Sequence, residues 1–385
     1  MNYDRPKERP SFGKFLGFNH VTFYVGNSKQ AASFYTSRFG FEYLAYKGLE
    51  TGSREIVSHV VISDKIVFEF QSSLDPQDKL GIGEHVKVHG DGVKSVTFEV
   101  ENCKAVYEHA ISQGASSVMS PTSTKDEFGE VIMAGIKAYN DTVHYLVKKI
   151  NYKGAFLPGY KEHPQKEIFN TILPSPELSF IDHVVSNQKV GDMEPTAQWY
   201  EKMLSFHRFW SVDDKIMHTE YSALNSIVMA DFDQVIKLPI NEPAKGKKVS
   251  QIQEYVDYYA GAGVQHIALR SFDIIKTITN LRKRGVEFLM VPKSYYDNLR
   301  KNIPKMSIKI IEDINKLEEL GILIDYDDKG YLLQLFTKPV EDRPTLFLEV
   351  IQRRNHQGFG AGNFKSLFKA IEDEQNKRGN LVDMK

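Results

Sequence analysis

The 385-residue chain contains a single cysteine, Cys103, and therefore no internal disulfide bond. It has no uninterrupted run of about 18 apolar residues, the length that a membrane-spanning helix needs. The first residues, MNYDRPKERPSFGKF, are polar and contain two prolines, unlike a secretory signal. One free thiol fits a reducing compartment. We therefore expect a cytoplasmic protein without a membrane span.

The sequence also lacks an excess of charge of either sign. It has 49 basic and 50 acidic residues, so its formal net charge is −1 at pH 7. A nucleic-acid-binding protein usually carries a broad basic surface, and this balance argues against nucleic acid as a partner. The remaining composition, 41% hydrophobic and 26% charged, is ordinary for a globular protein. A chain of this length is expected to form two domains.

The two halves of the chain repeat one pattern. Phe18–Tyr46 and the segment that starts at Phe180 each begin with an apolar strand that contains one histidine, His20 or His183. In each segment a loop, a helix with two adjacent aromatic residues and a second strand follow. The same order of elements in both halves predicts a duplicated domain.

The repeat continues to the end of each half. Gly92–Ala115 aligns with Gly263–Val286 as strand, helix and glycine, and Thr142–Val147 aligns with Thr345–Val350 as closing strands. An extra helical segment at about Ser294–Leu323 enlarges the second copy. It includes the amphipathic pattern KIIEDINKLEEL (309–320), which predicts a helix packed on the core.

Three potential metal ligands occupy matching strand positions of the second copy: His183, His266 and Glu349. Taken alone, a histidine in an apolar strand is usually a hydrogen-bonded core residue, and Glu349 would fit equally well on an edge strand facing water. Two imidazoles and one carboxylate, however, form the facial triad of non-haem Fe(II) oxygenases. Glu349 shares its strand face with Phe347 and Ile351, and a buried carboxylate must be neutral or paired. We therefore predict a metal site here.

In the first copy the aligned positions hold His20, Ser95 and Leu146. Leucine cannot bind a metal and serine is a poor ligand, so we expect one Fe(II) per chain and a metal-free first copy. The predicted divisions are a first domain, a proline-containing linker and a catalytic second domain: 1–160, 161–178 and 179–385.

Stretches of distinctive sequence run through nearly the whole chain: Leu49–Val61, Asn151–Tyr160, Phe206–Asp214, Ser250–Leu269, Lys329–Arg353 and Asn355–Gln375. They resemble the 4-hydroxyphenylpyruvate dioxygenase family, above all its animal members, within the vicinal oxygen chelate superfamily. The resemblance implies an α+β fold with two tandem domains. Each is built from repeated βαβββ modules that form an open, half-barrel sheet, and a C-terminal helix serves as a lid.

The same resemblance implies a function. The family converts 4-hydroxyphenylpyruvate and O2 to homogentisate and CO2 by oxidative decarboxylation, ring hydroxylation and side-chain migration, in tyrosine and phenylalanine catabolism. It uses Fe(II), and a homodimer is implied, with the first domain as the candidate for oligomerisation. The partners expected are therefore a small-molecule substrate, O2 and a second copy of the chain.

By resemblance, His183, His266 and Glu349 match the family's iron ligands. Nine further residues match its substrate pocket: Ser226, Asn241, Gln251, Gln265, Gln334, Phe336, Phe347, Phe359 and Phe364. Gln265 precedes His266 directly, and neighbours on a regular strand point to opposite faces. We expect Gln265 to reach the same site only if the strand twists or bulges there.

The predicted lid is a helix from Asn363 to about Lys377. Its Phe364, Leu367, Phe368 and Ile371 follow the spacing of one apolar helix face, after the glycine-rich segment GFGAGN. A glycine-rich loop is compliant enough to act as a hinge. If the helix closes the site, we expect Phe364 to meet the substrate ring.

Three alternatives stay open at this point. A relative that acts on the same substrate forms 4-hydroxymandelate, and only product analysis separates the two. A metal-free binding module of the same superfamily would not need the three ligands. An extradiol ring-cleaving dioxygenase would need a catechol substrate and an acid–base histidine that the sequence does not identify.

Overall fold

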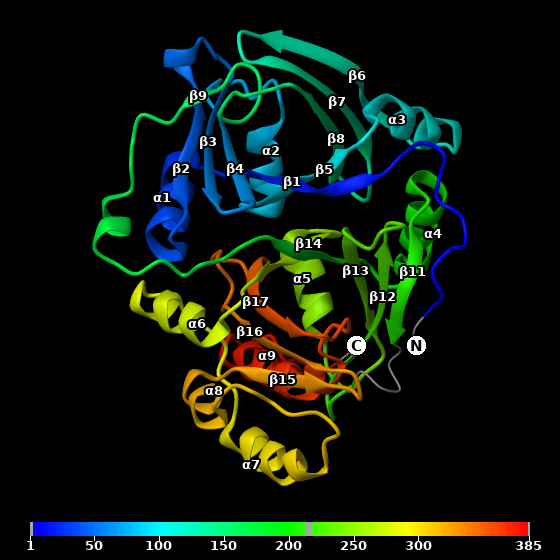
Figure 1. The fold of residues 1–385 in the computed structure, drawn as a ribbon, viewed down its shortest axis with the longest axis vertical. Helices are drawn as coiled ribbons and strands as arrows, with labels where there is room; N and C mark the ends of the chain where they lie inside the picture. The colour runs from blue at the N-terminus through cyan, green and yellow to red at the C-terminus, as the bar shows by residue number, and fades with distance from the viewer. Residues whose placement is uncertain (1–2, 213–217, 384–385) are drawn as a thin grey trace.

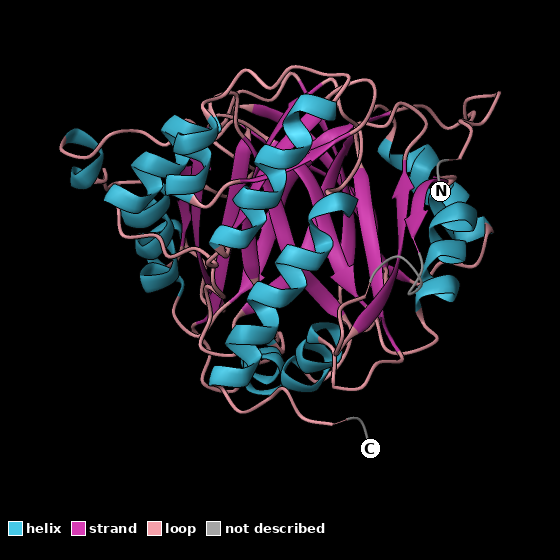
Figure 2. Cartoon of the chain, turned by 90° about the horizontal axis from the view of Figure 1, so that it is seen from below, coloured by secondary structure: helices cyan, strands magenta, loops and turns pink. Residues whose placement is uncertain are grey.

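The computed structural model describes residues 3–212 and 218–383. Its strands form two sheets, one from each half of the chain, which lie one above the other in Figure 1. Seen from below, helices lie in front of the strands and on both sides of them (Figure 2). Among the described residues, no helix combines the length and the apolar character needed to cross a membrane.

The first sheet has the strand order β6-β7-β8-β5-β1-β4-β3-β2-β9. Its strands are β1 (Phe15–Tyr24), β2 (Glu42–Lys47), β3 (Ile56–Ser63), β4 (Ile66–Ser73), β5 (Gly92–Val100), β6 (Ser117–Asp126), β7 (Gly129–Lys137), β8 (Val143–Ile150) and β9 (Lys161–Glu162). The helical segments of this half are α1 (Ser28–Phe39), η1 (Leu49–Thr51), α2 (Ile82–His89), α3 (Cys103–Ser112) and η2 (Ile168–Thr171).

The second sheet has the order β11-β12-β13-β10-β14-β17-β16-β15. Its strands are β10 (Ile181–Asn187), β11 (His207–Val212), β12 (Ala223–Ala230), β13 (Lys237–Ala244), β14 (Gly263–Arg270), β15 (Leu323–Tyr326), β16 (Tyr331–Phe336) and β17 (Phe347–Arg354). The helical segments are α4 (Met193–Leu204), α5 (Gln251–Tyr259), α6 (Ile274–Lys283), α7 (Lys293–Asn302), η3 (Ile303–Lys305), α8 (Ile314–Leu320), η4 (Ala361–Asn363) and α9 (Phe364–Lys377).

The two sheets share one topology. In the first, β1 pairs in parallel with β4 and antiparallel with β5, and β5 pairs in parallel with β8. In the second, β10, β13, β14 and β17 repeat these relationships in the same senses. The expected α+β fold, with two copies of one module, is therefore confirmed.

Local sequence explains where the recurring helix starts and ends. Before α1, the Asn27 side chain accepts a hydrogen bond from the backbone N–H of Gln30, which caps the helix. Gly40 ends α1 with a φ of 70°, a conformation that glycine adopts without strain. In the second copy, Ser205 ends α4 at a φ of 52°. This end of the helix therefore keeps its geometry although the glycine is lost.

A continuous apolar core includes buried residues from both copies. Between them, His144 of β8 lies 2.6 Å from the hydroxyl of Tyr200 in α4. The helix predicted over residues 309–320 is shorter than expected. It begins at Ile314, because the side chain of Asp313 accepts the N–H of Asn315 and caps the helix there. The segment before it is irregular.

Candidate functional site

Three neighbouring strands of the second sheet carry the predicted metal ligands. His183 of β10 lies opposite Ala268 of β14, and Ala268 in turn lies beside Glu349 of β17. His266 stands two residues before Ala268 and therefore points to the same face of the sheet. The sheet thus brings all three side chains together from segments far apart in the sequence.

The three side chains converge on one carboxylate oxygen. Oε2 of Glu349 lies 3.2 Å from Nε2 of His183 and 3.3 Å from Nε2 of His266. His183 and Glu349 are each only 2% exposed. The three residues form a group whose ligand atoms all lie within 4.8 Å of one another, so it could hold a metal ion.

The second nitrogen of each imidazole is held by an acceptor. Nδ1 of His183 lies 2.8 Å from Oδ1 of Asp182, and Nδ1 of His266 lies 2.9 Å from Oε1 of Gln265. Because these partners accept hydrogen bonds, each Nδ1 carries a proton and donates it. The other nitrogen, Nε2, of each ring then faces Glu349, the arrangement typical of metal-binding histidines.

Two β-bulges make these contacts between sequence neighbours possible. In the pairing of β10 with β14, Asp182 is an extra residue between Ile181 and His183. Gln265 is the extra residue on the opposite strand, between Val264 and His266. A bulge turns two successive side chains toward the same side. The condition under which we expected Gln265 to reach the site is therefore met.

The electrostatics of the group favour a bound cation. Burial works against any charged form, yet the nearby histidines keep the pKa of Glu349 below its usual value. Burial would lower the pKa of His183, but the carboxylates of Glu349 and Asp182 raise it instead. Oε1 of Glu349 is buried and has no hydrogen-bond partner among the described residues. The donor set and this free oxygen fit a metal ion.

The first copy has the same architecture without the ligands. His20 is 2% exposed, and its ring nitrogens face Oδ1 of Asn19 at 2.8 Å and the Thr97 hydroxyl at 3.2 Å. Burial lowers the pKa of His20 to about 4, so the ring is neutral. His20 is therefore a hydrogen-bonded core histidine.

The strand register corrects one alignment. Thr97, the counterpart of Ala268, pairs with Tyr145 rather than with Leu146. Leu146 points to the opposite face and is fully buried in the apolar core. The position that corresponds to Glu349 is thus Tyr145, which lines a cavity of about 370 Å³ together with His20 and Ser95. The sequence match of the closing strands is offset by one residue, which reverses the face of each side chain.

The aromatic residues assigned to the substrate pocket surround the two histidines. The Phe347 ring stacks on His266 at 4.8 Å, and Phe336 meets the same imidazole edge-on at 6.0 Å. Phe359 contacts His183, with ring centroids 5.1 Å apart and an interplanar angle of 81°. The side chain of Phe364, expected to complete this wall, lies outside the described residues.

The polar pocket residues fall into two groups. Ser226 and Asn241 lie directly opposite each other on β12 and β13 and are both buried. Gln251 and Gln265 line a cavity of about 30 Å³ with Phe347 and with Ile371 of α9. Such a volume holds about one water molecule.

Gln334 belongs to neither of these two groups of polar residues. Its side chain is 1% exposed, and neither of its polar atoms has a hydrogen-bond partner in the described part of the chain. A buried amide without partners is costly, and a bound ligand would relieve this cost. Gln334 is therefore a candidate for contact with the substrate.

Helix α9 covers the aromatic wall. Its Leu367, Ala370 and Ile371 form one apolar cluster with Phe336 and Phe347. In Figure 1, α9 lies beside β15, β16 and β17 of the second sheet. The helix therefore lies where a lid over the site would lie.

The sequence reasoning missed Asp182 and its ion pairs. Asp182 is 7% exposed and bonded to two arginines, Arg270 and Arg353. The sequence does contain a pattern that indicates these contacts. A residue with a side-chain oxygen directly precedes each of the three strand histidines, in Asn19–His20, Asp182–His183 and Gln265–His266. In a regular strand such pairs would diverge, so the signal depends on the bulges.

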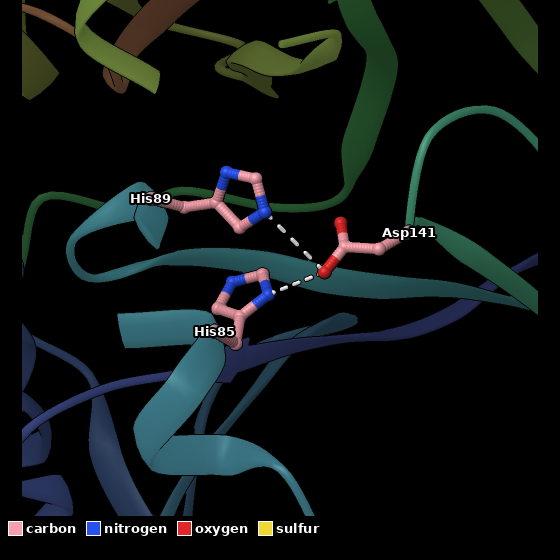
Figure 3. Close-up of side chains that lie close together, drawn as sticks. All are labelled: His85, His89 and Asp141. Carbon is pink, nitrogen blue, oxygen red and sulfur yellow. Dashed lines mark hydrogen bonds and ion pairs between the residues drawn. The ribbon is translucent and has the colours of Figure 1, made fainter. Parts of the chain in front are cut away.

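A second group of histidines and a carboxylate lies at the junction of the two copies. His85 and His89 of α2 both face Oδ2 of Asp141 (Figure 3), at 2.7 and 3.5 Å. The ammonium of Lys94 also lies 3.1 Å from this oxygen, and Nδ1 of His89 bonds to the Tyr259 carbonyl. Because a lysine already neutralises the carboxylate, the group is better explained as an ion-paired link between the copies than as a metal site.

Comparisons with known proteins agree with this geometry. A family model described as the Glyoxalase/Bleomycin resistance protein/Dioxygenase superfamily matches residues 17–147 and 180–335. The 4-hydroxyphenylpyruvate dioxygenase of Xenopus tropicalis is 58% identical over 382 residues, which cover 99% of this chain and 97% of the relative. That of Tetrahymena thermophila is 56% identical over 381 residues, covering 98% and 94%.

A similar solved structure is a mutant of 4-hydroxymandelate synthase from Streptomyces coelicolor. It superposes with a TM-score of 0.81 at 27% identity and covers 94% of this chain and 99% of its own.

Proposed function

The chain belongs to the 4-hydroxyphenylpyruvate dioxygenase family, within the vicinal oxygen chelate proteins, and we therefore propose that His183, His266 and Glu349 hold one Fe(II) ion per chain. The enzyme converts 4-hydroxyphenylpyruvate and O2 to homogentisate and CO2. The relatives carry the name of this activity, whereas the similar synthase structure shares only about half as much sequence identity with the chain.

One observation carries the metal assignment. A single buried carboxylate oxygen, Oε2 of Glu349, lies within 3.3 Å of two Nε2 atoms. Asp182 and Gln265 fix the opposite side of each ring as a donor. Two Nε2 lone pairs that face a carboxylate repel it unless a proton or a metal cation lies between them. When bound, Fe(II) supplies the redox chemistry with O2 that side chains alone cannot perform.

The side chains around the triad bind and orient the substrate. Phe336 and Phe347 offer flat apolar surfaces to its ring, since aromatic rings prefer stacked or edge-on contacts. The free amide of Gln334 and the adjacent pair of Ser226 and Asn241 provide hydrogen bonds for its polar groups. Phe359 and the helix α9 exclude water from the site. We also assign Phe364 to this wall, because it begins α9.

The division of the chain follows from this assignment. Residues 1–160 form a metal-free domain with a role in oligomerisation, 161–178 form the linker, whose first two residues add β9 to the first sheet, and 179–385 carry the iron site and the lid. We further propose a homodimer in the cytoplasm. The location is supported by the single cysteine, which is buried and unpaired, as is usual in a reducing compartment.

Replacing the ligands tests the proposal, with the first copy as an internal control. His183→Ala, His266→Ala and Glu349→Gln should each abolish binding of Fe(II) and formation of homogentisate while the circular dichroism spectrum stays unchanged. The matched control is His20→Ala, which should keep one iron per chain and lose about 2 kcal/mol of stability.

Metal analysis and product identification are the measurements. A ligand variant that keeps stoichiometric iron and a normal rate would remove that residue from the site. Two irons per chain, one of them lost in His20→Ala, would overturn the assignment. Formation of 4-hydroxymandelate in place of homogentisate would refute the product.

A further inference from the structure

A buried arginine holds the carboxylate that lies behind His183. Arg353 of β17 donates from Nε to Oδ2 of Asp182 at 3.0 Å, and from its terminal nitrogen Nη2 to Oδ1 at 2.7 Å. Its side chain is 7% exposed, and that of Asp182 is 6% exposed. A bidentate, buried pair of this kind fixes the orientation of both groups. Asp182 in turn orients His183 through Nδ1.

The same guanidinium holds the loop that leads to α9. Arg353 donates from its other terminal nitrogen, Nη1, to the backbone carbonyls of His356 and Gly358. Its guanidinium carbon also lies 5.3 Å from the centre of the Phe359 ring. Residues 355–363, the hinge loop, are thereby attached to the arginine by two hydrogen bonds and one cation–π contact.

His183 is therefore contacted from two sides by groups that Arg353 holds. Asp182 bonds to one edge of the imidazole, and the Phe359 ring packs against it at 5.1 Å. If the hinge loop moved away, Phe359 and the arginine would lose their places together. The orientation of His183 and the docking of the loop thus depend on one side chain.

The first copy provides a comparison within the same molecule. There Asn19 takes the place of Asp182 and bonds to His20 at the same distance of 2.8 Å. The other end of the Asn19 amide donates to Glu99, where the second copy has Arg270. The first copy thus keeps the hydrogen bond to the histidine but lacks the ion pair. The buried ion pair accompanies the proposed metal site and not the fold.

We propose that Arg353 is a positioning residue that couples docking of the hinge loop, residues 355–363, to the orientation of the metal ligand His183. The inference rests on the proposed function, because it takes His183 as a ligand. Coupling of this kind is reciprocal. Metal binding should stabilise the docked loop, and a docked loop should strengthen metal binding.

The test uses a pair of buried arginines that both bond to Asp182. Arg353→Gln removes the contacts with Asp182 and with the loop. The matched control is Arg270→Gln, because Arg270 donates to Oδ2 of Asp182 at 3.1 Å and otherwise to the carbonyl of Arg353, outside residues 355–363. Two properties of the full-length protein are measured. The first is Co(II) affinity, followed by the visible absorption of the ion, and the second is hydrogen exchange of the loop amides with and without Co(II).

We expect Arg353→Gln to weaken Co(II) binding by about 10- to 100-fold, the range typical when a partner of a metal ligand is lost. Its loop amides should exchange faster, and Co(II) should no longer slow them. Arg270→Gln should also weaken Co(II) binding, yet its loop should still become protected when the metal binds. Unchanged affinity in Arg353→Gln, or a metal-dependent loop protection that survives in it, would overturn the inference.

Two further variants keep the test decisive. Asp182→Asn keeps an oxygen for Nδ1 of His183, as in the Asn19–His20 pair, but removes the charge that pairs with Arg270 and Arg353. It should weaken Co(II) binding and loosen the loop together. If Arg353→Gln does not fold, Arg353→Lys is judged by the same two measurements. His183→Ala separates the two proposals. If Co(II) affinity is unchanged in this variant, the metal site is refuted. If Co(II) affinity depends on His183 but not on Arg353, only the coupling is refuted.

Discussion

The side-chain oxygen of Gln265 lies 2.9 Å from Nδ1 of His266, although the two residues are consecutive on one strand. The bulge in β14 turns both side chains toward the triad. Gln265 therefore orients the imidazole of His266, in addition to lining the small cavity beside Phe347. This contact with His266 distinguishes Gln265 from Gln251, which lines the same cavity from α5.

Replacing these two glutamines should therefore give different results. Gln265→Leu should lower metal affinity by about tenfold, because His266 loses the acceptor that fixes its ring. Gln251→Leu should leave metal affinity unchanged and weaken only the binding of substrate. Titration with Fe(II) or Co(II), together with KM for 4-hydroxyphenylpyruvate, measures both effects. Equal metal affinities in the two variants would show that Gln265 serves the substrate alone.

Gly360 should be needed for its close approach to Gln334. A Cβ atom at Gly360 would collide with the side-chain amide of Gln334, and the residue has a φ of +79°. The control is Gly379, which has a φ of +75° but leaves open space, among the described residues, where a Cβ would lie. Both Gly→Ala changes should cost about 1 kcal/mol of stability through backbone strain. Only Gly360→Ala should also lower turnover, measured as homogentisate formed at saturating substrate, with iron content unchanged.

Deleting α9 should uncouple the reaction. Removal of the chain from Asn363 onward exposes Phe336 and Phe347, which Leu367 and Ile371 cover in the intact protein. We expect iron to stay bound, while consumption of O2 exceeds formation of homogentisate because water enters the site. An oxygen electrode combined with product analysis gives the ratio.

A point variant provides a check in case the truncated chain does not fold. Leu367→Ala should raise the ratio of O2 consumed to homogentisate formed, whereas Lys369→Ala, on the exposed side of the helix, should not. A well-folded truncation with normal coupling would refute the lid.

His144 should contribute to acid sensitivity. Burial lowers its pKa from 6.5 to about 4. The ring is held neutral between the Val96 carbonyl and the Tyr200 hydroxyl. Since the unfolded chain takes up the proton first, stability is fully present above pH 6.5 and falls as the pH drops toward 4. The shift corresponds to about 3 kcal/mol.

The variant His144→Gln removes this titration. Its free energy of unfolding should be lower than that of the natural protein at pH 7, and the difference should shrink as the pH falls to about 4. Urea unfolding at several pH values measures it. A difference that is constant across this range would exclude His144 as a source of the acid sensitivity.

The duplication and the proposed ligands can be inferred from the order of residues alone. The repeat places His183 in the strand equivalent to that of His20 and His266 in the strand equivalent to that of Ser95, and the alternation in the final strand puts Glu349 on an apolar face. These inferences are possible because side-chain direction along a strand follows directly from residue spacing. The C-terminal helix was predictable for the same reason, from the period of Leu367 and Ile371.

The register and the bulges, in contrast, become known only when the strands are placed beside one another. Whether Tyr145 or Leu146 corresponds to Glu349 depends on how β8 pairs with β5, and the sequence of one strand does not contain that pairing. The contacts of Asp182 and Gln265 with their neighbouring histidines likewise require an extra residue in one strand relative to its partner. Bulges and registers arise from backbone hydrogen bonds between segments far apart in the chain, so local patterns cannot specify them. The same holds for Arg353, whose contacts exist only because β10, β17 and the hinge loop meet.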